Sequence, residues 1–478
     1  FERISWDEAL DTITAKLLEV KEKHGARALA VCVGGTILYS AAPGLTLLRR
    51  FLDVYGTPHY FSADSMCYRP RMIAYIMTLG WFPSPDPENA KCVIVWANNP
   101  HASDPMRARL IERALKKGAK LIVIDPRRTT AAKKADLHLQ VRPGTDCALA
   151  LGMLNVIVSE NLYDAEFVNN WTIGFDKLAE HVKPFTPEEV EKITWVPAET
   201  IRSAARLYAT TRPATILQGT NGLDQTTSGF QSARAVAILQ AITGNIDVAG
   251  GFVTPSGLRL SPMRLPDMVK EKAIAEERYP LAYEIWGRPI GEGQGMVLYD
   301  TLLTGEPYPI KAMIIQGSNP LLSWPNSNKL REALGKLDFL VVMSVFMSET
   351  AQLADIVLPA ATFMEKDDII VDIYWMEYGI PYVMLRKKVL QFEEARSDAE
   401  FWLELAKRMG YGEYFPWKDA EEFLDYVLEP TGLSTRQLRE EMPGGVQYGF
   451  IKYDKYKEKG GFRTPSGKVE IYSETMKD

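Results

Sequence analysis

A cysteine followed by two arginines is the group with the clearest chemical potential in this sequence. Cys67 ends the polar loop 62–67, which follows the short apolar pair Tyr60-Phe61, and Arg69 and Arg71 come directly after it. Positive charge favours the ionised thiol, and a thiolate acts as a soft metal ligand or as a nucleophile. A partly buried structural cysteine is the other reading, and no His and Asn at a recognisable spacing indicate a cysteine hydrolase.

Two apolar runs, each followed by polar residues, predict a second set of chemical groups. The run 92–96 is short and has no polar break, as expected of a strand covered on both faces, and a second buried strand is predicted to end at Asp125. A helix is predicted between them, with Ser103 or Asp104 as its cap and Gly118 after its end. Ligands of parallel sheets bind beyond the carboxyl ends of the strands, so residues 98–104 and 125–128 are expected to meet at one crevice.

The same pattern recurs later in the chain. Its predicted strand, helix and second strand are 312–317, 326–334 and 339–343. Both copies carry Asn-Pro after the first strand, at Asn99 and Asn319, and both carry Ala-x-x-Ala-Asp before a third apolar run, ending at Asp136 and Asp355. Two copies in register indicate a duplicated nucleotide-binding unit, and so two similar ligands or one extended ligand. Two ordinary βαβ units of a large α/β protein are the alternative that this pattern leaves open.

Composition narrows the class of protein. The chain has 478 residues, which predicts more than one domain, and its 46% hydrophobic and 24% charged content is that of a globular protein. A net charge of -6, with no basic stripe or polybasic tract, favours neither a nucleic-acid nor a membrane-surface partner, and no apolar run is long enough for a membrane span. Four scattered cysteines argue against a disulfide framework or a cysteine-bound cluster within this chain. The chain starts at Phe1 without a signal peptide, so cytoplasm and periplasm both stay open.

Further elements follow from hydrophobic spacing. Strands are predicted at 28–33 and 215–219, and helices at 6–23, 45–55, 148–159, 164–170, 187–193, 197–210, 229–243 and 398–409. Residues 254–309 are rich in Pro and Gly, and we interpret them as a connection that crosses between domains. Residues 372–378 carry several aromatic side chains and belong either to an active-site loop or to a buried strand.

Taken together, these segments resemble the molybdopterin oxidoreductase family, typified by dimethyl sulfoxide reductase and formate dehydrogenase, over nearly the whole chain. Within the family, the sequence most resembles the branch that contains acetylene hydratase. The motifs that carry the resemblance are Ile4-Ser-Trp-Asp-Glu-Ala-Leu10, Asn99-Pro100, Ile124-Asp-Pro-Arg127, Arg142-Pro-Gly-Thr-Asp146, the segment from Leu239 to Gly251, Gly317-Ser-Asn-Pro320, Glu349 to Pro359, and Thr464-Pro-Ser-Gly-Lys-Val-Glu470.

The resemblance implies an α/β fold with two related doubly wound, mostly parallel-sheet (Rossmann-like) domains and a discontinuous chain path. Residues 1–62 and 263–375 would form the first dinucleotide-binding domain, and 63–262 the second, with the metal-ligand loop. Residues 376–478 would form a helical and mixed segment that leads to a C-terminal domain. Because the family's N-terminal iron–sulfur domain and C-terminal domain are not in this sequence, we expect the chain to be the central part of a longer protein.

Cofactors and site residues follow from the same resemblance. The family holds Mo or W through the dithiolenes of two molybdopterin guanine dinucleotides, and its metal-ligating side chain stands where Cys67 is. Asp64, Tyr68 and Arg69 would line the substrate side, with Cys67, Asp64 and Arg69 as the catalytic residues. The expected cofactor-binding residues are Asn98, Asn99, Ser103, Asp125, Arg127, Arg142, Gly144, Asp146, Gly219, Asn221, Gly317, Ser318 and Asn319.

Three functions are compatible with this resemblance. The first is two-electron redox of a small-molecule substrate in anaerobic metabolism, with a 4Fe-4S cluster in the full-length protein, no cluster ligands in this chain, and an iron–sulfur electron-transfer subunit as partner. The second is a non-redox hydratase on the same cofactor, with Asp64 as acid or base. The third is a non-catalytic scaffold subunit. Two positions depart from the family: Ser344 replaces a frequent Asp, and Tyr68 replaces the His of formate dehydrogenases.

Overall fold

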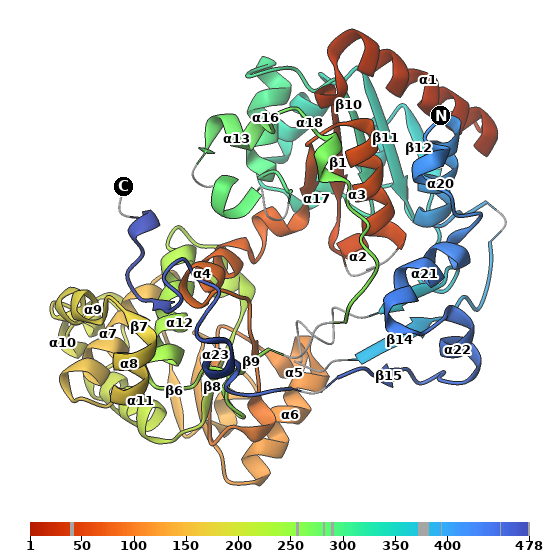
Figure 1. Ribbon diagram of the computed structural model, residues 1–478. Helices are drawn as coiled ribbons and strands as arrows, with labels where there is room; N and C mark the ends of the chain where they lie inside the picture. The colour runs from red at the N-terminus through yellow and green to blue at the C-terminus, as the bar shows by residue number, and fades with distance from the viewer. Residues whose placement is uncertain are drawn as a thin grey trace. The chain divides into compact units, whose positions relative to one another are not determined.

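The computed structural model describes residues 1–38, 43–254, 258–280, 283–287, 291–370, 382–392, 394–449 and 451–476. The chain forms two compact units, each built on a parallel sheet that helices cover (Figure 1). Unit 1 comprises Phe1–Met66, Leu258–Asp372 and Tyr382–Tyr448, and unit 2 comprises Cys67–Gly257, Ile373–Pro381 and Gly449–Asp478. The chain thus passes from one unit to the other more than once, and it enters unit 2 for the first time at Cys67.

The sheet of unit 1 has five parallel strands in the order β12-β11-β10-β1-β2. Its strands are β1 (Leu29–Val33), β2 (Tyr60–Ser62), β10 (Ala312–Gln316), β11 (Phe339–Ser344) and β12 (Ile356–Pro359). Neighbours β1 and β10 pair in register, Leu29 opposite Ala312, although they lie far apart in the sequence. The predicted α/β class, with a parallel sheet and a discontinuous chain path, is confirmed.

Helices cover both faces of this sheet because its strands are apolar on both sides. Leu29, Val31 and Val33 pack into one core with the helices α1 (Trp6–His24), α3 (Pro43–Tyr55) and α20 (Asp398–Arg408). Ala30 and Cys32 point to the other core, with α16 (Gly295–Thr304) and α18 (Ser327–Leu334). Ser5 begins α1 as predicted, since its side chain accepts a hydrogen bond from the Glu8 N–H.

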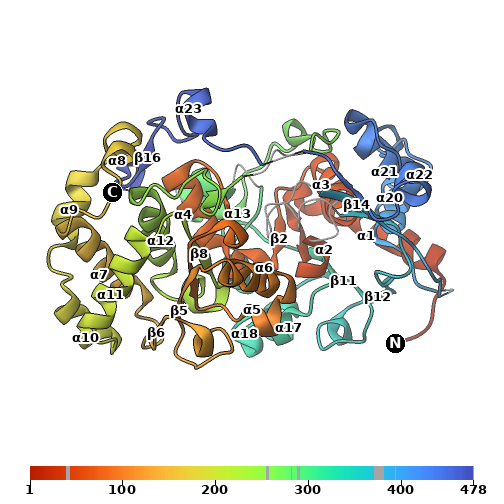
Figure 2. The same cartoon turned by 90° about the horizontal axis from the view of Figure 1, so that it is seen from below.

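The sheet of unit 2 has four parallel strands in the order β6-β5-β4-β8. They are β4 (Cys92–Trp96), β5 (Lys120–Ile124), β6 (Leu137–Leu139) and β8 (Ala214–Gln218). One face packs on α4 (Arg69–Leu79), α7 (Asp146–Ser159), α11 (Ala198–Thr210) and α12 (Gly229–Ile242), and the other packs on α6 (Pro105–Lys116). Figure 2 shows α7 beside α10 (Pro187–Thr194) and α11, which pack against it.

The remaining elements are short. Helices are α2 (Gly35–Leu38), α5 (Pro100–Ser103), α8 (Ala165–Trp171), α9 (Phe175–Val182), α13 (Ile274–Arg278), α17 (Pro320–Ser323), α21 (Ala420–Leu428), α22 (Thr435–Glu440) and α23 (Lys455–Lys459). Strands are β3 (Ser84–Pro85), β7 (Thr172–Ile173), β9 (Phe252–Val253), β13 (Asp368–Ile370), β14 (Tyr382–Arg386), β15 (Val446–Gln447) and β16 (Val469–Glu470). Within the described ranges, no helix combines the length and the apolar character of a membrane span.

The predicted duplication is visible in matching hydrogen bonds. Asp136 accepts from the Leu121 N–H at 2.8 Å, and Asp355 accepts from the Leu340 N–H at 2.7 Å. In each case a carboxylate in the loop before the third strand fastens the start of the second strand. The aspartate that ends each Ala-x-x-Ala-Asp motif therefore makes the same hydrogen bond in the two units, which explains why both motifs end in aspartate.

Two predicted segments differ from the structure. Residues 254–309 were expected to hold no long periodic segment, but α16 lies within them and buries Val297, Leu298 and Leu302 against the sheet of unit 1. Helix α16 is only ten residues long and is flanked by Gly and Pro, so its apolar pattern was too short to predict a helix.

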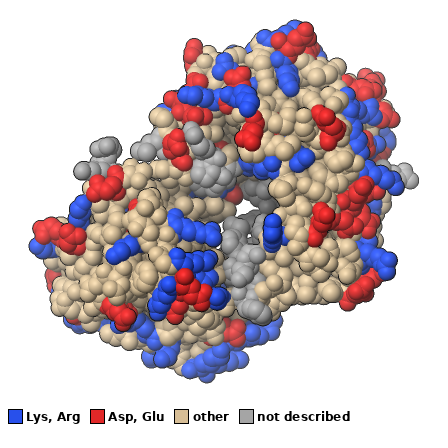
Figure 3. Space-filling view, in the orientation of Figure 1, with Lys and Arg blue, Asp and Glu red and all other residues tan. Residues whose placement is uncertain are grey.

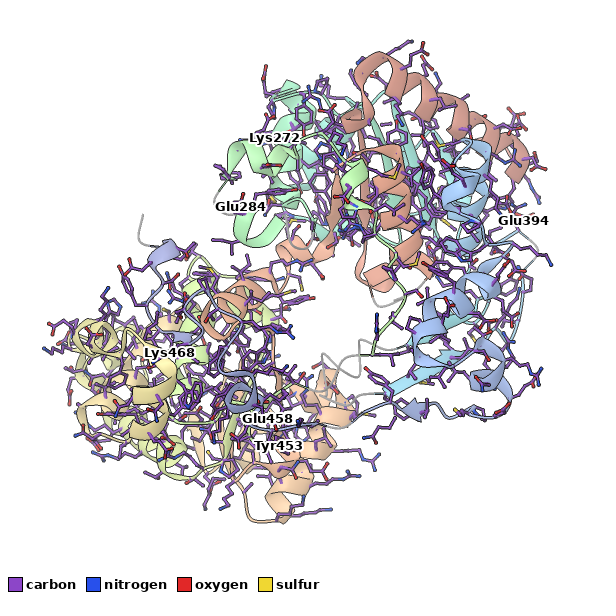
Figure 4. The ribbon with its side chains drawn as sticks, in the orientation of Figure 1. Lys272, Glu284, Glu394, Tyr453, Glu458 and Lys468 are labelled. Atoms are coloured by element: carbon purple, nitrogen blue, oxygen red, sulfur yellow. The ribbon has the colours of Figure 1, made fainter. Side chains whose placement is uncertain are left out.

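The expected segment 376–478 is divided between the units instead of standing apart. Its part up to Tyr448 packs on unit 1 through α20 and α21, whereas the part from Gly449 onward joins unit 2, where β16 pairs with β7. Tyr453, Glu458 and Lys468 belong to this last part (Figure 4). The aromatic stretch 372–378 lies outside the described residues.

Candidate active site

The loop before Cys67 is held by hydrogen bonds at both ends. A 3-10 turn spans Ala63–Met66, with Ser62 Oγ accepting from the Asp64 N–H at 3.1 Å. Ser65 Oγ donates to the Ser62 carbonyl at 3.0 Å and accepts from the Gly295 N–H at 3.0 Å. Ser62 Oγ also donates to the carboxylate of Glu292, which is only 1% exposed. These bonds fix the backbone that leads into Cys67.

Cys67 and Cys147 keep partial access to solvent, whereas Cys32 and Cys92 do not. Cys32 and Cys92 are buried, and burial raises the pKa of both thiols, that of Cys92 to about 12. Cys147 is partly buried, and burial raises its pKa as well. Cys67 is partly exposed and forms no disulfide. It is therefore the cysteine whose setting best suits a role as metal ligand or nucleophile.

The two arginines after Cys67 have different surroundings. Arg69 is 6% exposed, donates to the Met72 sulfur at 3.3 Å, and lies 5.8 Å from the ring centroid of Tyr68. Arg71 donates to the Gln218 carbonyl at 2.8 Å, and its Nε lies 3.3 Å from a carboxylate oxygen of Asp224. The guanidinium of Arg71 therefore interacts with the end of β8 and the loop after it. Its effect on the Cys67 thiol stays a prediction.

Asp224 is a buried acid that sequence reasoning missed. It is 2% exposed, and burial raises its pKa to about 7, against the opposing charge of Arg71 and a hydrogen bond from Gln218 Nε2 at 2.6 Å. Tyr75 in turn donates to Gln218 Oε1 at 3.0 Å. No local motif marks this network, since its members come from α4, β8 and the loop after β8.

The exits of β4 and β8 touch each other. A Cβ built on Gly219 would lie 1.8 Å from the carbonyl oxygen of Ala97, so only glycine fits there. Ala97 itself has a φ of 49°, and Asn98 and Asn99 follow it at the start of α5. This close approach joins the two strand exits at the carboxyl edge of the sheet, where ligands of parallel sheets bind.

One of the two predicted caps of the helix near this edge is confirmed. Asp104 caps α6, because its carboxylate accepts from the Arg107 N–H at 3.0 Å. Ser103 instead donates to the Asn99 carbonyl at 3.1 Å, so its hydroxyl closes the turn of α5. Asn221 is exposed on the loop after β8, between Gly219 and the buried Asp224.

Two buried carboxylates end at the same edge. Asp125 is 3% exposed and accepts from the Arg127 N–H at 2.7 Å, while the Arg127 side chain reaches into solvent. Asp146 is 5% exposed and accepts from Trp96 Nε1 at 2.8 Å. Burial raises the pKa of Asp146, and the negative charge of Asp125 adds to this. Gly144, with a φ of 83°, makes the turn that brings Asp146 back to Trp96.

Positive charge gathers around α6 and the exit of β5. Between residues 105 and 134 there are ten Lys and Arg but only two Asp and Glu, in a chain whose net charge is -6. Several of these cations pair with acids, among them Lys120 with Asp136 and Lys134 with Glu112, so the local excess is smaller than the count. Figure 3 shows blue side chains at the lower end of unit 2, and Arg109, Lys116 and Arg128 are among the exposed ones. Such a surface suits a ligand that carries phosphate.

The matching edge of unit 1 repeats the glycine contact. A Cβ built on Gly34 would lie 1.9 Å from the carbonyl oxygen of Gly317, whose φ is 55°. Ser318 follows, partly exposed. Asn319 donates to Glu349 at 2.7 Å and accepts from the Thr350 hydroxyl at 2.7 Å. Its side-chain amide links its own loop to residues 349–350, and the expected contact of Asn319 with a dinucleotide stays a prediction.

Asp398 is a further site residue that sequence reasoning missed. It is the first residue of α20, as Asp146 is of α7, and it lies 3.3 Å from Gln316 Nε2, whereas Asp146 bonds Trp96. Gln316 and Trp96 are the last residues of equivalent strands. Asp398 also pairs with Lys366. The alignment of Ser397-Asp398 with Thr145-Asp146 is the signal that would have found it.

Comparisons with known proteins agree with this geometry. A family model described as molybdopterin oxidoreductase matches residues 1–408. The chain is 35% identical to the acetylene hydratase of Syntrophotalea acetylenica over 503 residues, which cover 99% of this chain and 67% of that protein. It is also 35% identical to the F420-dependent formate dehydrogenase subunit alpha of Methanocaldococcus jannaschii over 401 residues, 81% of this chain and 58% of that protein.

A solved structure gives the same result. The acetylene hydratase from Pelobacter acetylenicus superposes with a TM-score of 0.89 at 33% identity, over 100% of this chain and 68% of that one. The fold defines a doubly wound α/β protein with two parallel sheets. More specifically, the chain belongs to the molybdopterin oxidoreductase family, an enzyme family that uses a molybdopterin cofactor with Mo or W.

The residues present fit such a cofactor. Gly34 and Gly219 let neighbouring strand exits approach closely at the carboxyl edges of the two sheets, which is where parallel sheets bind their ligands. Buried carboxylates at Asp125 and Asp146 offer acceptors for ribose hydroxyls and amino groups. The basic surface around α6 offers charge for phosphate.

Proposed function

We propose that this chain is the catalytic portion of a Mo or W enzyme in which each unit binds one molybdopterin guanine dinucleotide and Cys67 ligates the metal. The observation that carries the proposal is the repeated strand exit, with Gly34 against Gly317 in unit 1 and Gly219 against Ala97 in unit 2. Two equivalent edges suit two equivalent ligands. When bound, the cofactor supplies a metal that exchanges two electrons with a small substrate.

The chain's own residues have distinct roles in this proposal. Asn98 and Asn99 present backbone amides to the diphosphate of one dinucleotide, Gly219 holds the neighbouring strand exit beside them, and Asp146 accepts from the guanine edge. Gly317 and Ser318 serve the second dinucleotide, and Asp398 is the acceptor for its guanine, since Ser344 stands where the family often has an Asp. Ser344 itself accepts from the Phe346 N–H at 3.2 Å, which occupies its hydroxyl within its own loop.

Proton handling falls in this proposal to two acids, Asp64 and Asp224. Asp64 follows Ser62 in the fixed turn, close in sequence to the proposed ligand. Asp224 has a pKa of about 7 and lies beside Arg71, so it can hold or release a proton near neutral pH. Arg69 would face an anionic or polarised substrate. An iron–sulfur cluster in the rest of the protein, and an iron–sulfur partner subunit, would carry electrons.

A non-redox hydratase is the second candidate, because 35% identity and a TM-score of 0.89 relate the chain to acetylene hydratases. Measuring turnover with and without an electron acceptor distinguishes the two. A redox enzyme requires a dye or a protein acceptor, whereas a hydratase adds water without net electron transfer.

Elemental analysis of the full-length protein tests the proposal. We expect about one Mo or W and two guanine nucleotides per chain. In Cys67→Ala, the guanine content should persist while catalytic activity is lost, and Cys147→Ala serves as a control at another partly buried cysteine. Full activity in Cys67→Ala would remove the metal-ligand assignment, and a folded protein without guanine would remove the cofactor assignment.

A further inference from the structure

A tryptophan in a strained backbone conformation stands at the ligand-binding edge of unit 2. Trp195 follows the last residue of α10 and has a φ of 65°, and its N–H donates to the Glu191 carbonyl at 2.8 Å. Glycine usually occupies this position after a helix, because a Cβ is unfavourable at positive φ. A large aromatic side chain at this position therefore calls for a compensating role.

Core packing does not supply that compensation. The Trp195 side chain is 67% exposed, and it belongs to none of the hydrophobic clusters of the described residues. Among the described residues, Arg142 contacts the Trp195 ring, and its guanidinium lies 5.1 Å from the ring centroid. An exposed aromatic face beside a guanidinium is a surface on which another planar group can stack.

The position of this pair relates it to Asp146. The Arg142 N–H donates to the Thr194 carbonyl at 2.8 Å, so the residue before Trp195 is fastened to the loop 142–146. Thr145 Oγ1 donates to the Arg142 carbonyl at 2.7 Å, and the buried Asp146 follows directly. The aromatic face and the acceptor carboxylate thus belong to one fixed loop system.

We propose that Trp195, with Arg142, forms the wall on which the guanine base of the unit 2 dinucleotide stacks. The inference rests on the proposed function, in which unit 2 binds a guanine nucleotide. Stacking depends on the flat face of a base and hardly on its identity, whereas an acceptor such as Asp146 selects the N1–H and amino group of guanine. Trp195 therefore sets purine affinity, and Asp146 sets the preference for guanine.

This division of roles gives different signatures for two variants. Binding of GMP and AMP to the chain is measured by titration calorimetry. We expect Trp195→Gly to weaken both nucleotides by the same factor, about tenfold, because it removes stacking alone. We expect Asp146→Asn to weaken GMP while leaving AMP nearly unchanged. Trp195→Phe should retain most of the affinity, since a ring remains.

Folding is controlled in the same experiment. Because glycine relaxes the backbone at positive φ, Trp195→Gly should raise the midpoint of thermal unfolding while it weakens binding. Asn161→Gly makes the same backbone change at another exposed residue of unit 2 with a φ of 55°, and it should leave both affinities unchanged.

Three outcomes would overturn the inference. Unchanged nucleotide affinities in Trp195→Gly, with GMP binding lost in Asp146→Asn, would leave the proposed function intact and remove the stacking role. A lower unfolding midpoint in Trp195→Gly with unchanged GMP affinity would make Trp195 a structural residue. Absence of GMP binding in the unsubstituted chain would overturn the stacking role together with the assignment of unit 2 as a guanine-nucleotide site.

Discussion

Gly34 and Gly317 meet so closely that a Cβ on Gly34 would lie 1.9 Å from the Gly317 carbonyl oxygen. The Gly34 N–H also donates to the Gln316 carbonyl at 3.0 Å, so the exits of β1 and β10 are joined edge to edge. Gly219 repeats this relationship at β8, where its N–H donates to the Trp96 carbonyl at 2.8 Å. Glycine is required at both positions by the neighbouring backbone, and these two strand exits carry the proposed nucleotide sites.

Replacing Gly34 with alanine should destabilise unit 1, because the neighbouring backbone must move to admit the methyl group. We expect a loss of about 2 kcal/mol in the free energy of unfolding, measured by urea denaturation. Gly35→Ala is the matched control, since no atom lies within 4 Å of a Cβ built there and its φ is not in the positive range. Equal stability of the two variants would show that the strand exits separate easily.

Asp224 should make the stability of unit 2 depend on pH. Its pKa is raised from 3.8 to about 7 on folding, so the folded state favours the protonated acid. The stabilisation is complete below about pH 4 and is lost as pH rises toward 7, by at most about 1.4 kcal/mol per pH unit. The difference in unfolding free energy between the natural chain and Asp224→Asn, followed from pH 4 to 8, should show this slope. A constant difference would contradict the proposed protonation.

Asp398 should act in unit 1 as Asp146 does in unit 2. Asp398→Asn is expected to lower the guanine content of the full-length protein by removing one nucleotide of the proposed two, because the neutral amide donates where guanine also donates. Acid release followed by chromatography of the nucleotides measures this. Asp176→Asn, at an exposed acid of unit 2, is the control. Full guanine content in Asp398→Asn would show that Asp398 is not needed to bind the second nucleotide.

Ser397 should stabilise the helix that carries Asp398. Its hydroxyl accepts from the Glu400 N–H, and the Glu400 carboxylate accepts from the Ser397 N–H at 2.7 Å, which completes a capping box. Ser397→Ala is expected to cost about 1 kcal/mol of unfolding free energy in thermal or urea denaturation. Ser397→Asp should recover most of this loss, since aspartate also caps helices. No change in Ser397→Ala would mean that packing of Trp402 alone positions α20.

Local sequence patterns determined the strands, the longer helices and the repeat. Mostly apolar runs such as 92–96 and 312–316 are typical of strands in a parallel sheet with both faces covered. They could therefore be recognised as strands from the sequence. Asp136 and Asp355 were recognisable because each belongs to a short motif at a fixed distance from its strand. Cys67, with its neighbouring arginines, was likewise a local feature.

Tertiary structure alone decided what depends on distant partners. Asp224 acquires its raised pKa from burial beside α4 and β8, and Asp398 becomes the counterpart of Asp146 only because α20 packs on the sheet of unit 1. The strain at Trp195 arises from its positive φ, and the residue type gives no sign of that backbone angle. Burial, pKa and strain arise when segments far apart in the chain come together, and for that physical reason they cannot be read from a local pattern.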